Sequence, residues 1–283
     1  MMDILVVGNC CHDTLLLPHG EYEALGGSTS YISAALGAAG VDYRVIGKVG
    51  EDFLYADQLP YKPIVTSARP TTRFVDDLRP QGERICILKS VCDPIRPEDL
   101  PREKAKIGIA CGVAMELLPE TLVAMRERVE ILICDAQGLL RQADIEGRVQ
   151  LRKLSLTDFH AVYDRIDYLK ASVTEARYLD LPLGPVKLVV TEGPKGAILR
   201  ERGDEVVIPS VPTEEVDATG AGDSFVAGLS LGLLSGLSPV EAIRQGNRYG
   251  ALAVTAVGVP DFTKLFAERA AGSPALSPES TRI

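Results

Sequence analysis

Short apolar runs recur along the chain, and segments with helical spacing lie between them. The runs predict strands, which in chain order cover residues 4–7, 43–47, 106–112, 131–135, 166–170, 186–191, 197–200 and 205–209. Helices are predicted for residues 31–39, 119–127, 157–165, 225–234 and 239–257. Runs without polar alternation are typical of strands that are covered on both faces. The pattern therefore predicts an α/β fold with a mostly parallel central sheet and helices on both sides.

One stretch interrupts this alternation. Residues 71–76 and 83–90 have the character of two strands, joined by a polar connection at 77–82. They predict a hairpin that stands off the main sheet as a lid, or an ordinary antiparallel pair at the edge of that sheet. The pattern alone does not separate these two interpretations.

Composition and charge narrow the classes of partner. The formal net charge is -9 and the chain contains no Trp, so neither nucleic acid nor an anionic membrane surface is an expected partner. No run of 18 apolar residues predicts a membrane span, and the first residues are typical of a strand rather than of a signal peptide. The six cysteines lack C-x-x-C spacing, and Cys86, Cys111 and Cys134, which lie inside apolar runs, are expected to be reduced core residues. The sequence Cys10-Cys11-His12-Asp13 is a weak alternative as a metal site, because no second Cys/His cluster completes four ligands. We expect a cytoplasmic protein.

The stretch from Asp217 to Phe225 carries the most specific chemistry. Gly220, Ala221 and Gly222 lie at the predicted start of a buried helix, where backbone N–H groups and the helix dipole favour a phosphate. Asp223 would repel a resting phosphate, but it suits proton abstraction from a hydroxyl that attacks one. A simple turn followed by a first-turn acid is an alternative. A dinucleotide fingerprint is a weaker one, because Phe225 occupies the position of its last glycine.

Polar residues also follow the predicted strands. Asp13 comes at or just beyond the end of the first strand, and Asp135 and Gln137 follow the strand at 131–135. Gly26 and Gly27 precede the helix at 31–39, either as a turn or as a place where a ligand meets the backbone. Ligands of open α/β sheets bind at the carboxyl ends of the strands.

Taken in order, these motifs resemble the ribokinase-like (PfkB) carbohydrate kinases over nearly the whole chain, to about residue 262. The 217–225 stretch is similar to the family's C-terminal signature, and Gly26-Gly27 with residues 48–52 is similar to its N-terminal one. Several segments resemble the plant-type myo-inositol kinase branch, namely 6–13, 92–95, 118–122, 135–137 and 168–172.

The resemblance implies a fold, ligands and site residues. It implies one ribokinase-like kinase domain at 1–270, with lid strands from about 13–25 and 71–90, and it allows a homodimer through the lid. The Pro- and Ser-rich composition of 271–283 predicts a disordered tail. The implied substrates are ATP, used with Mg²⁺, and a small neutral polyol, with myo-inositol favoured. The implied base is Asp223, and the implied anion hole is the backbone N–H groups of residues 220–223. The other implied roles are polyol binding by Asp13, Gly26, Gly27, Asp135 and Gln137, nucleotide binding by Ser172, Thr191, Gly193 and Asn247, and organisation of Mg²⁺ by Glu175.

Two departures from the family pattern bear on the substrate. The Asn that usually follows the Gly-Gly pair is absent from 28–33, and Asn-x-x-Glu is replaced by Ser172-Val173-Thr174-Glu175. Both departures resemble the inositol kinase branch. A kinase of another sugar or nucleoside, and a non-catalytic nucleotide- or sugar-binding regulator, remain alternatives. The chain has no G-x-x-x-x-G-K-[ST] loop and no protein-kinase signature.

Overall fold

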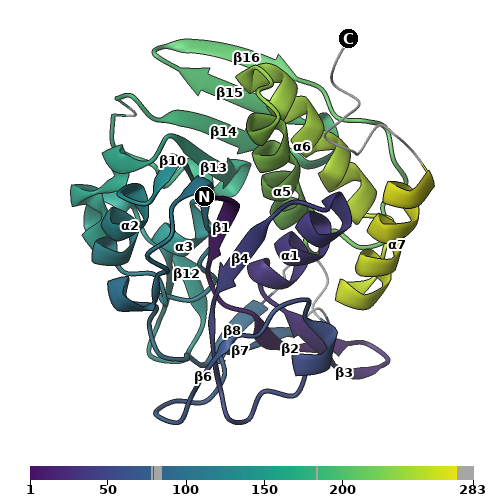
Figure 1. Ribbon diagram of the computed structural model, residues 1–283. Helices are drawn as coiled ribbons and strands as arrows, with labels where there is room; N and C mark the ends of the chain where they lie inside the picture. Colours follow the sequence, from purple (N-terminus) through teal and green to yellow (C-terminus); the bar gives the residue numbers. More distant parts are fainter. Residues whose placement is uncertain (78, 80–84, 183, 273–283) are drawn as a thin grey trace.

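The computed structural model describes residues 1–77, 79, 85–182 and 184–272 (Figure 1). Its central sheet has eight strands in the order β16-β15-β14-β13-β10-β9-β1-β4. Their bounds are β1 Met2–Val7, β4 Tyr43–Ile46, β9 Ala105–Ala110, β10 Val129–Asp135, β13 Tyr168–Ser172, β14 Lys187–Thr191, β15 Ala197–Glu201 and β16 Asp204–Ile208. Every pairing from β4 to β14 is parallel, and β15 and β16 are antiparallel. The predicted mostly parallel sheet is confirmed.

Strand β1 shows why the apolar runs lack alternation. Ile4 and Val6 pack into one hydrophobic cluster, and Leu5 and Val7 pack into another on the opposite face. Successive side chains of a strand point to opposite faces, so a strand between two layers of helices is apolar at nearly every position.

Helices cover both faces of the sheet (Figure 1). One face packs against the helices α1 Ser28–Ala39, α5 Ala221–Leu234, α6 Pro239–Ala253 and α7 Gly258–Gly272. The other packs against α2 Pro119–Arg126, the short helices α3 Gln137–Leu140 and α4 Val173–Ala176, and a series of 3₁₀ turns. Among the described residues, no helix combines the length and apolar character that crossing a membrane requires.

A second, four-stranded sheet lies at one end of the central sheet (Figure 1). We call it the small sheet; its strands, in the order β3-β2-β7-β8, are β2 Cys11–Leu17, β3 Gly20–Gly26, β7 Arg73–Asp77 and β8 Ile85–Ser90. It joins two hairpins through the parallel pairing of β2 with β7. The stretches predicted to form the lid, 13–25 and 71–90, are therefore adjacent. Most of the connection between β7 and β8 lies outside the described residues.

Two smaller strand pairs are absent from the sequence prediction. The first is β5 Lys48–Gly50 with β6 Ile64–Thr66, and the second is the hairpin β11 Arg141–Ala143 with β12 Val149–Leu151. The second hairpin touches the small sheet, because the amide of Leu88 donates to the carbonyl of Gly147 at 2.7 Å. A bridge between Ile87 and Arg148 extends this contact.

Several predicted helix bounds are wrong. Residues 157–165 form separate 3₁₀ turns, because Phe159 and Val162 face the core at a spacing of three residues. Helix α6 ends at Ala253 rather than near 257, since the carbonyl of Val254 accepts the amides of Val216 and Asp217 instead of continuing the helix.

The ends of α5 and α7 also differ from the prediction. Helix α5 begins at Ala221, four residues before the predicted Phe225, so the glycine motif forms its first turn. Helix α7 was not predicted, and it includes residues 271 and 272 of the predicted disordered tail. The rest of that tail lies outside the described residues.

Candidate active site

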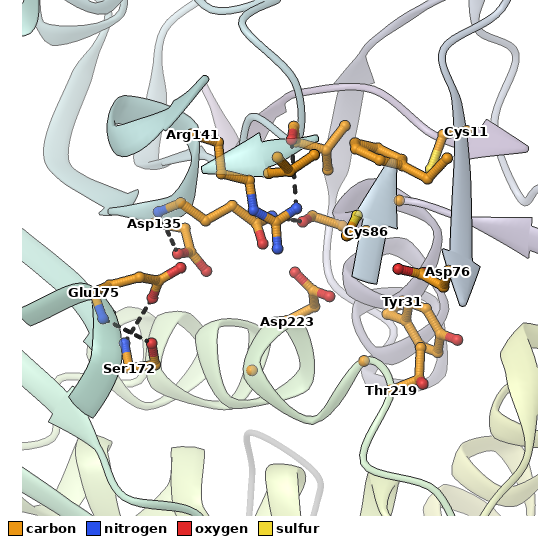
Figure 2. Close-up of a pocket in the computed structure, with 18 of the residues that line it drawn as sticks. Cys11, Tyr31, Asp76, Cys86, Asp135, Arg141, Ser172, Glu175, Thr219 and Asp223 are labelled. Atoms are coloured by element: carbon orange, nitrogen blue, oxygen red, sulfur yellow. Dashed lines mark hydrogen bonds between the residues drawn. The ribbon is translucent and has the colours of Figure 1, made fainter. Parts of the chain in front are cut away.

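A pocket of about 440 Å³ opens between the carboxyl ends of the parallel strands and the small sheet. Strands β10 and β13 and the start of α5 line one side, and strands β2, β7 and β8 line the other. Figure 2 shows Asp135, Glu175 and Asp223 on the first side and Cys11, Asp76 and Cys86 on the second. The predicted residues that line the pocket are Asp13, Gly27, Asp135, Gln137, Ser172, Glu175, Gly220, Gly222 and Asp223.

The first turn of α5 offers backbone donors to the pocket. Gly220 caps the helix with φ 77°, and the amides of Ala221 and Ser224 are used within the turn. Among the described residues, the amides of Gly220, Gly222 and Asp223 donate to no acceptor. Such amides at a helix N-terminus form an anion site. Of the four amides predicted for the anion hole, that of Ala221 is donated to Ala218.

Close packing explains both glycines of this turn. A Cβ on Gly220 would lie 2.3 Å from the ring of Tyr31, and one on Gly222 would lie 2.8 Å from Nζ of Lys170. Gly220 also has a positive φ, which side chains rarely adopt. A larger residue at either position would push the helix start away from its neighbours.

Asp223 directs its carboxylate from the first turn of α5 into the pocket (Figure 2). Burial raises its pKa to about 6, and the nearby carboxylate of Asp135 adds to this. Ser28, Lys170 and Arg141 act in the opposite direction and lower it. A carboxylate with a pKa near 6 is mostly ionised at neutral pH and suits a general base.

Asp13 points into the pocket from the small sheet. The thiol of Cys11 donates to its Oδ1 at 3.1 Å. A Cβ on Gly26, which pairs with Cys11, would lie 1.9 Å from Oδ2 of Asp13, so only glycine leaves room for this carboxylate. Gly27 has φ 87°, and a Cβ there would lie 2.6 Å from the carbonyl oxygen of Asn9. The glycine pair therefore serves close packing beneath Asp13.

Gln137 links the loop after β10 to the start of α1. Its Nε2 donates to Oγ of Ser28 at 3.0 Å and to the carbonyl of Gly112 at 3.2 Å. Its backbone amide donates to Asp135. These bonds fix the turn after β10 against the start of α1.

Glu175 forms a reciprocal cap with Ser172. Oε2 of Glu175 accepts the amide of Ser172 at 2.7 Å, and Oγ of Ser172 accepts the amide of Glu175 at 3.2 Å. Burial opposes ionisation of Glu175, but the charge of Lys170 and the Ser172 hydrogen bonds bring its pKa below the usual value. The carboxylate is therefore charged and lines the pocket.

This donor set fits Mg²⁺ held through water and donor phosphates. No group of three or more His, Cys, Asp or Glu side chains in the described part of the chain is arranged to hold a metal. Mg²⁺ commonly uses one or two carboxylates together with phosphates and waters. Glu175 supplies such a carboxylate.

Three predicted nucleotide residues lie away from the lining of this pocket. Thr191 donates to the carbonyl of Ala171, and Gly193 follows it in a turn with φ 56°. Asn247 is buried in α6, where its side-chain Nδ2 donates to the backbone carbonyls of Ile208 and Pro209. Their roles at a nucleotide stay predictions.

Comparison with known proteins places the chain in a family. A family model described as pfkB family carbohydrate kinase matches residues 136–263. An inositol 3-kinase of Arabidopsis thaliana is 38% identical over 279 residues, which cover 94% of this chain and 78% of that protein. One of Oryza sativa subsp. japonica is 42% identical over 276 residues, covering 91% and 70%. The chain belongs to the pfkB family of carbohydrate kinases.

Solved structures confirm the ribokinase-like fold of this pfkB kinase. One describes a pyrophosphate-dependent myo-inositol-1 kinase converted into a myo-inositol-3 kinase, with a TM-score of 0.75 and 19% identity. The structural match covers 94% of this chain and 99% of the myo-inositol kinase chain. A ribokinase from Thermotoga maritima has a TM-score of 0.72 and 20% identity, covering 96% and 100%.

Sequence reasoning missed several residues of this pfkB site. Tyr31, Asp76, Arg141 and Lys170 all line the pocket. Lys170 alone left a usable signal, since it is a charged residue inside a predicted buried strand. The other three reach the site through the packing of separate elements.

Proposed function

We propose that the protein is an ATP-dependent kinase that phosphorylates myo-inositol, at the 3-hydroxyl. The observation that carries this proposal is the 38% and 42% identity to inositol 3-kinases. The site supports it, because a base and an anion site lie on one side of the pocket and Asp13 lies on the other. Cytoplasmic location and pairing of two chains through the small sheet stay predictions.

The acceptor is held from the small sheet. A carboxylate can accept hydrogen bonds from two vicinal hydroxyl groups, so Asp13 suits a polyol ring. Gly27 and Gln137 line the same space and leave room for a compact acceptor. This arrangement turns one hydroxyl of the bound ring toward α5.

Asp223 takes the proton of that hydroxyl as its oxygen attacks the γ-phosphorus in line. The amides of Gly222 and Asp223 donate to the phosphoryl oxygens, where charge develops in the transition state. Mg²⁺, when bound near Glu175, would neutralise charge on the donor phosphates. The small sheet excludes water from the reacting atoms, which limits hydrolysis of the donor.

The test is ADP formation from Mg-ATP with a panel of myo-inositol, other inositols, ribose, fructose and adenosine. We expect a strong preference for myo-inositol, and a turnover with Asp223→Asn that is lower by about 10²–10⁴. The 1- and 3-phosphates of myo-inositol are mirror images, so chiral chromatography must identify the product. If another acceptor is preferred, that compound replaces myo-inositol as the proposed substrate. Nucleotide binding without turnover across the panel would favour a non-catalytic regulator. Turnover with pyrophosphate in place of ATP would make pyrophosphate the proposed phosphoryl donor.

A further inference from the structure

Lys170 is a buried lysine in the middle of β13, two residues before the strand ends at Ser172. Only 7% of its surface is exposed, and it lines the pocket. Lysine is almost never buried without a partner, and a strand between two hydrophobic layers has no structural need of one. Its position therefore requires an explanation from the site.

Two contacts place the ammonium group of Lys170 beside the anion site. Nζ donates to Oδ2 of Asp135 at 2.9 Å. A Cβ on Gly222 would lie 2.8 Å from the same Nζ, so the ammonium lies against the first turn of α5. Residue 222 is glycine because the lysine occupies the space of its side chain.

The surrounding charges keep Lys170 protonated. Burial alone would lower its pKa, but the carboxylates of Asp135, Glu175 and Asp223 raise it above the ordinary value. These three groups come from β10, α4 and α5, and among the described residues Arg141 of β11 is the other cation that lines the pocket. Without Lys170, three carboxylates would surround a site meant for an anion.

Lys170 also has donor capacity to spare. An ammonium group has three N–H donors, and one is given to Asp135. In the part of the chain that the structure describes, the other two meet no acceptor. The ammonium group lies against Gly222, whose amide, like that of Asp223, donates to no acceptor in the described residues.

We propose that Lys170 is a further catalytic residue, which donates hydrogen bonds to the phosphoryl group held at the start of α5. This inference rests on the proposed function and deepens it. As the acceptor oxygen bonds to the γ-phosphorus, the bond to the β-γ bridging oxygen breaks and ADP keeps that electron pair. The acceptor proton passes to Asp223, and Lys170 keeps its own proton throughout.

The test measures pyrophosphate binding to the whole protein by isothermal titration calorimetry, without any acceptor. We expect Lys170→Ala to weaken binding by about 10- to 100-fold, as for the loss of hydrogen bonds to a charged group. Lys170→Arg should retain most of the affinity. Lys187→Ala is the matched control, since Lys187 lies at the amino end of the neighbouring strand β14 and pairs with Glu201. It should bind as the wild type does.

Asp135→Asn separates catalysis from a merely structural ion pair. If Lys170 served only to neutralise Asp135, the two single variants would lose affinity alike, and the proposal would be overturned. We expect Asp135→Asn to bind pyrophosphate at least as tightly as the wild type, because a nearby negative charge is removed. If Lys170→Ala fails to fold, the double variant Lys170→Met/Asp135→Asn replaces it in the test, because it removes both charges of the ion pair together. If the double variant binds pyrophosphate as tightly as the wild type, the proposal is also overturned.

A kinetic measurement completes the test. Methylammonium should restore part of the turnover number of Lys170→Ala and leave Lys187→Ala unchanged, and absence of rescue would count against a phosphoryl contact. Failure of the proposed function can be told apart from failure of this inference. If the proposed function is wrong, the wild type shows no turnover, but the pyrophosphate-binding measurements can still be made and interpreted. Absence of pyrophosphate binding by the wild type would overturn the anion site itself.

Discussion

Asp223 combines two demands that conflict. A base must be ionised, yet this carboxylate faces a buried pocket with Asp135 close by, and its pKa is raised to about 6. Lys170 and Arg141 limit that rise. The site therefore holds a base that is charged at neutral pH and still has affinity for a proton.

The pH dependence of catalysis follows from this pKa. We expect kcat/KM for the acceptor to fall about tenfold per pH unit below about 6, since protonated Asp223 cannot accept the hydroxyl proton. Steady-state rates between pH 5 and 8 give the profile. Arg141→Met should move the acidic limb to higher pH, because Arg141 lowers the pKa of Asp223. A rate that stays constant down to pH 5 would contradict the assignment.

Removing the charge separates catalysis from stability. We expect Asp223→Asn to lose about 10²–10⁴ in turnover while still binding ATP. Because the folded-state pKa is raised from 3.8, ionised Asp223 costs stability, and this cost grows as the pH rises from 3.8 through about 6. The variant should therefore melt at a higher temperature than the wild type, by more at pH 7 than at pH 4. Asp261→Asn, an exposed first-turn acid of α7, is the control and should keep full turnover.

At this scale the sequence predicted the motif but not its surroundings. Asp223 and its glycines are contiguous, so their pattern identifies them. The Lys170–Asp135 pair joins residues that are 35 positions apart. They lie on neighbouring strands, and the sequence pattern does not predict which strands are neighbours. The proposed charge balance could be found only in the structure.

Among the elements, the start of α5 is the most constrained. Its N-cap, Gly220, packs on Tyr31 of α1, whose ring meets Phe262 of α7 at a centroid distance of 5.3 Å. Phe262 in turn contacts Phe266 at 4.4 Å. An aromatic cluster on one face of the sheet thereby supports the anion site from behind.

Substituting Gly220 tests this support. We expect Gly220→Ala to lose about 100-fold in turnover, because the new Cβ would meet the ring of Tyr31 and displace the amides. Gly236→Ala is the matched control, since Gly236 has the same φ of 77° with nothing within 4 Å of a Cβ. The left-handed backbone should cost each variant about 1–2 kcal/mol of stability in urea unfolding, and Gly220→Ala should lose more because its Cβ also meets Tyr31. Equal activity of the two variants would contradict the role of the Tyr31 contact.

Helices and strands could be predicted where the local pattern of apolar residues determines them. Apolar runs located all eight strands of the central sheet. In the inner strands burial on both faces leaves a continuous signal, whereas β16 at the edge is exposed at every residue but Ile208. The 3₁₀ turns and the β11–β12 hairpin were missed, since short elements take their conformation from the surfaces on which they pack.

Over the whole molecule, the site depends on contact between the central layers and the small sheet. The β11–β12 hairpin follows β10 of the central sheet, and its Gly147 carbonyl accepts the amide of Leu88 in β8. Arg141 and Leu151 of this hairpin line the pocket. The hairpin thus connects the acceptor side of the pocket to the donor side.

Gly147→Ala tests this connection. Gly147 has φ 82°, and a Cβ there would lie 2.7 Å from the carbonyl oxygen of Leu88. We expect the hairpin to separate from β8, the KM for the acceptor to rise by roughly tenfold, and amide exchange at Leu88 to accelerate. Gly203→Ala, with φ 95° and open space, should change neither quantity. An unchanged KM together with unchanged exchange at Leu88 would contradict the connection.

The pairing of β2 with β7 bears on how the chain acquires its activity during synthesis. The four strands of the small sheet are complete once Ser90 has left the ribosome, whereas Asp223 and the amides of α5 follow much later. Translation therefore delivers the acceptor-binding groups long before the base. A chain that stops before Asp223 lacks the base and the amides of α5, and it cannot consume the donor.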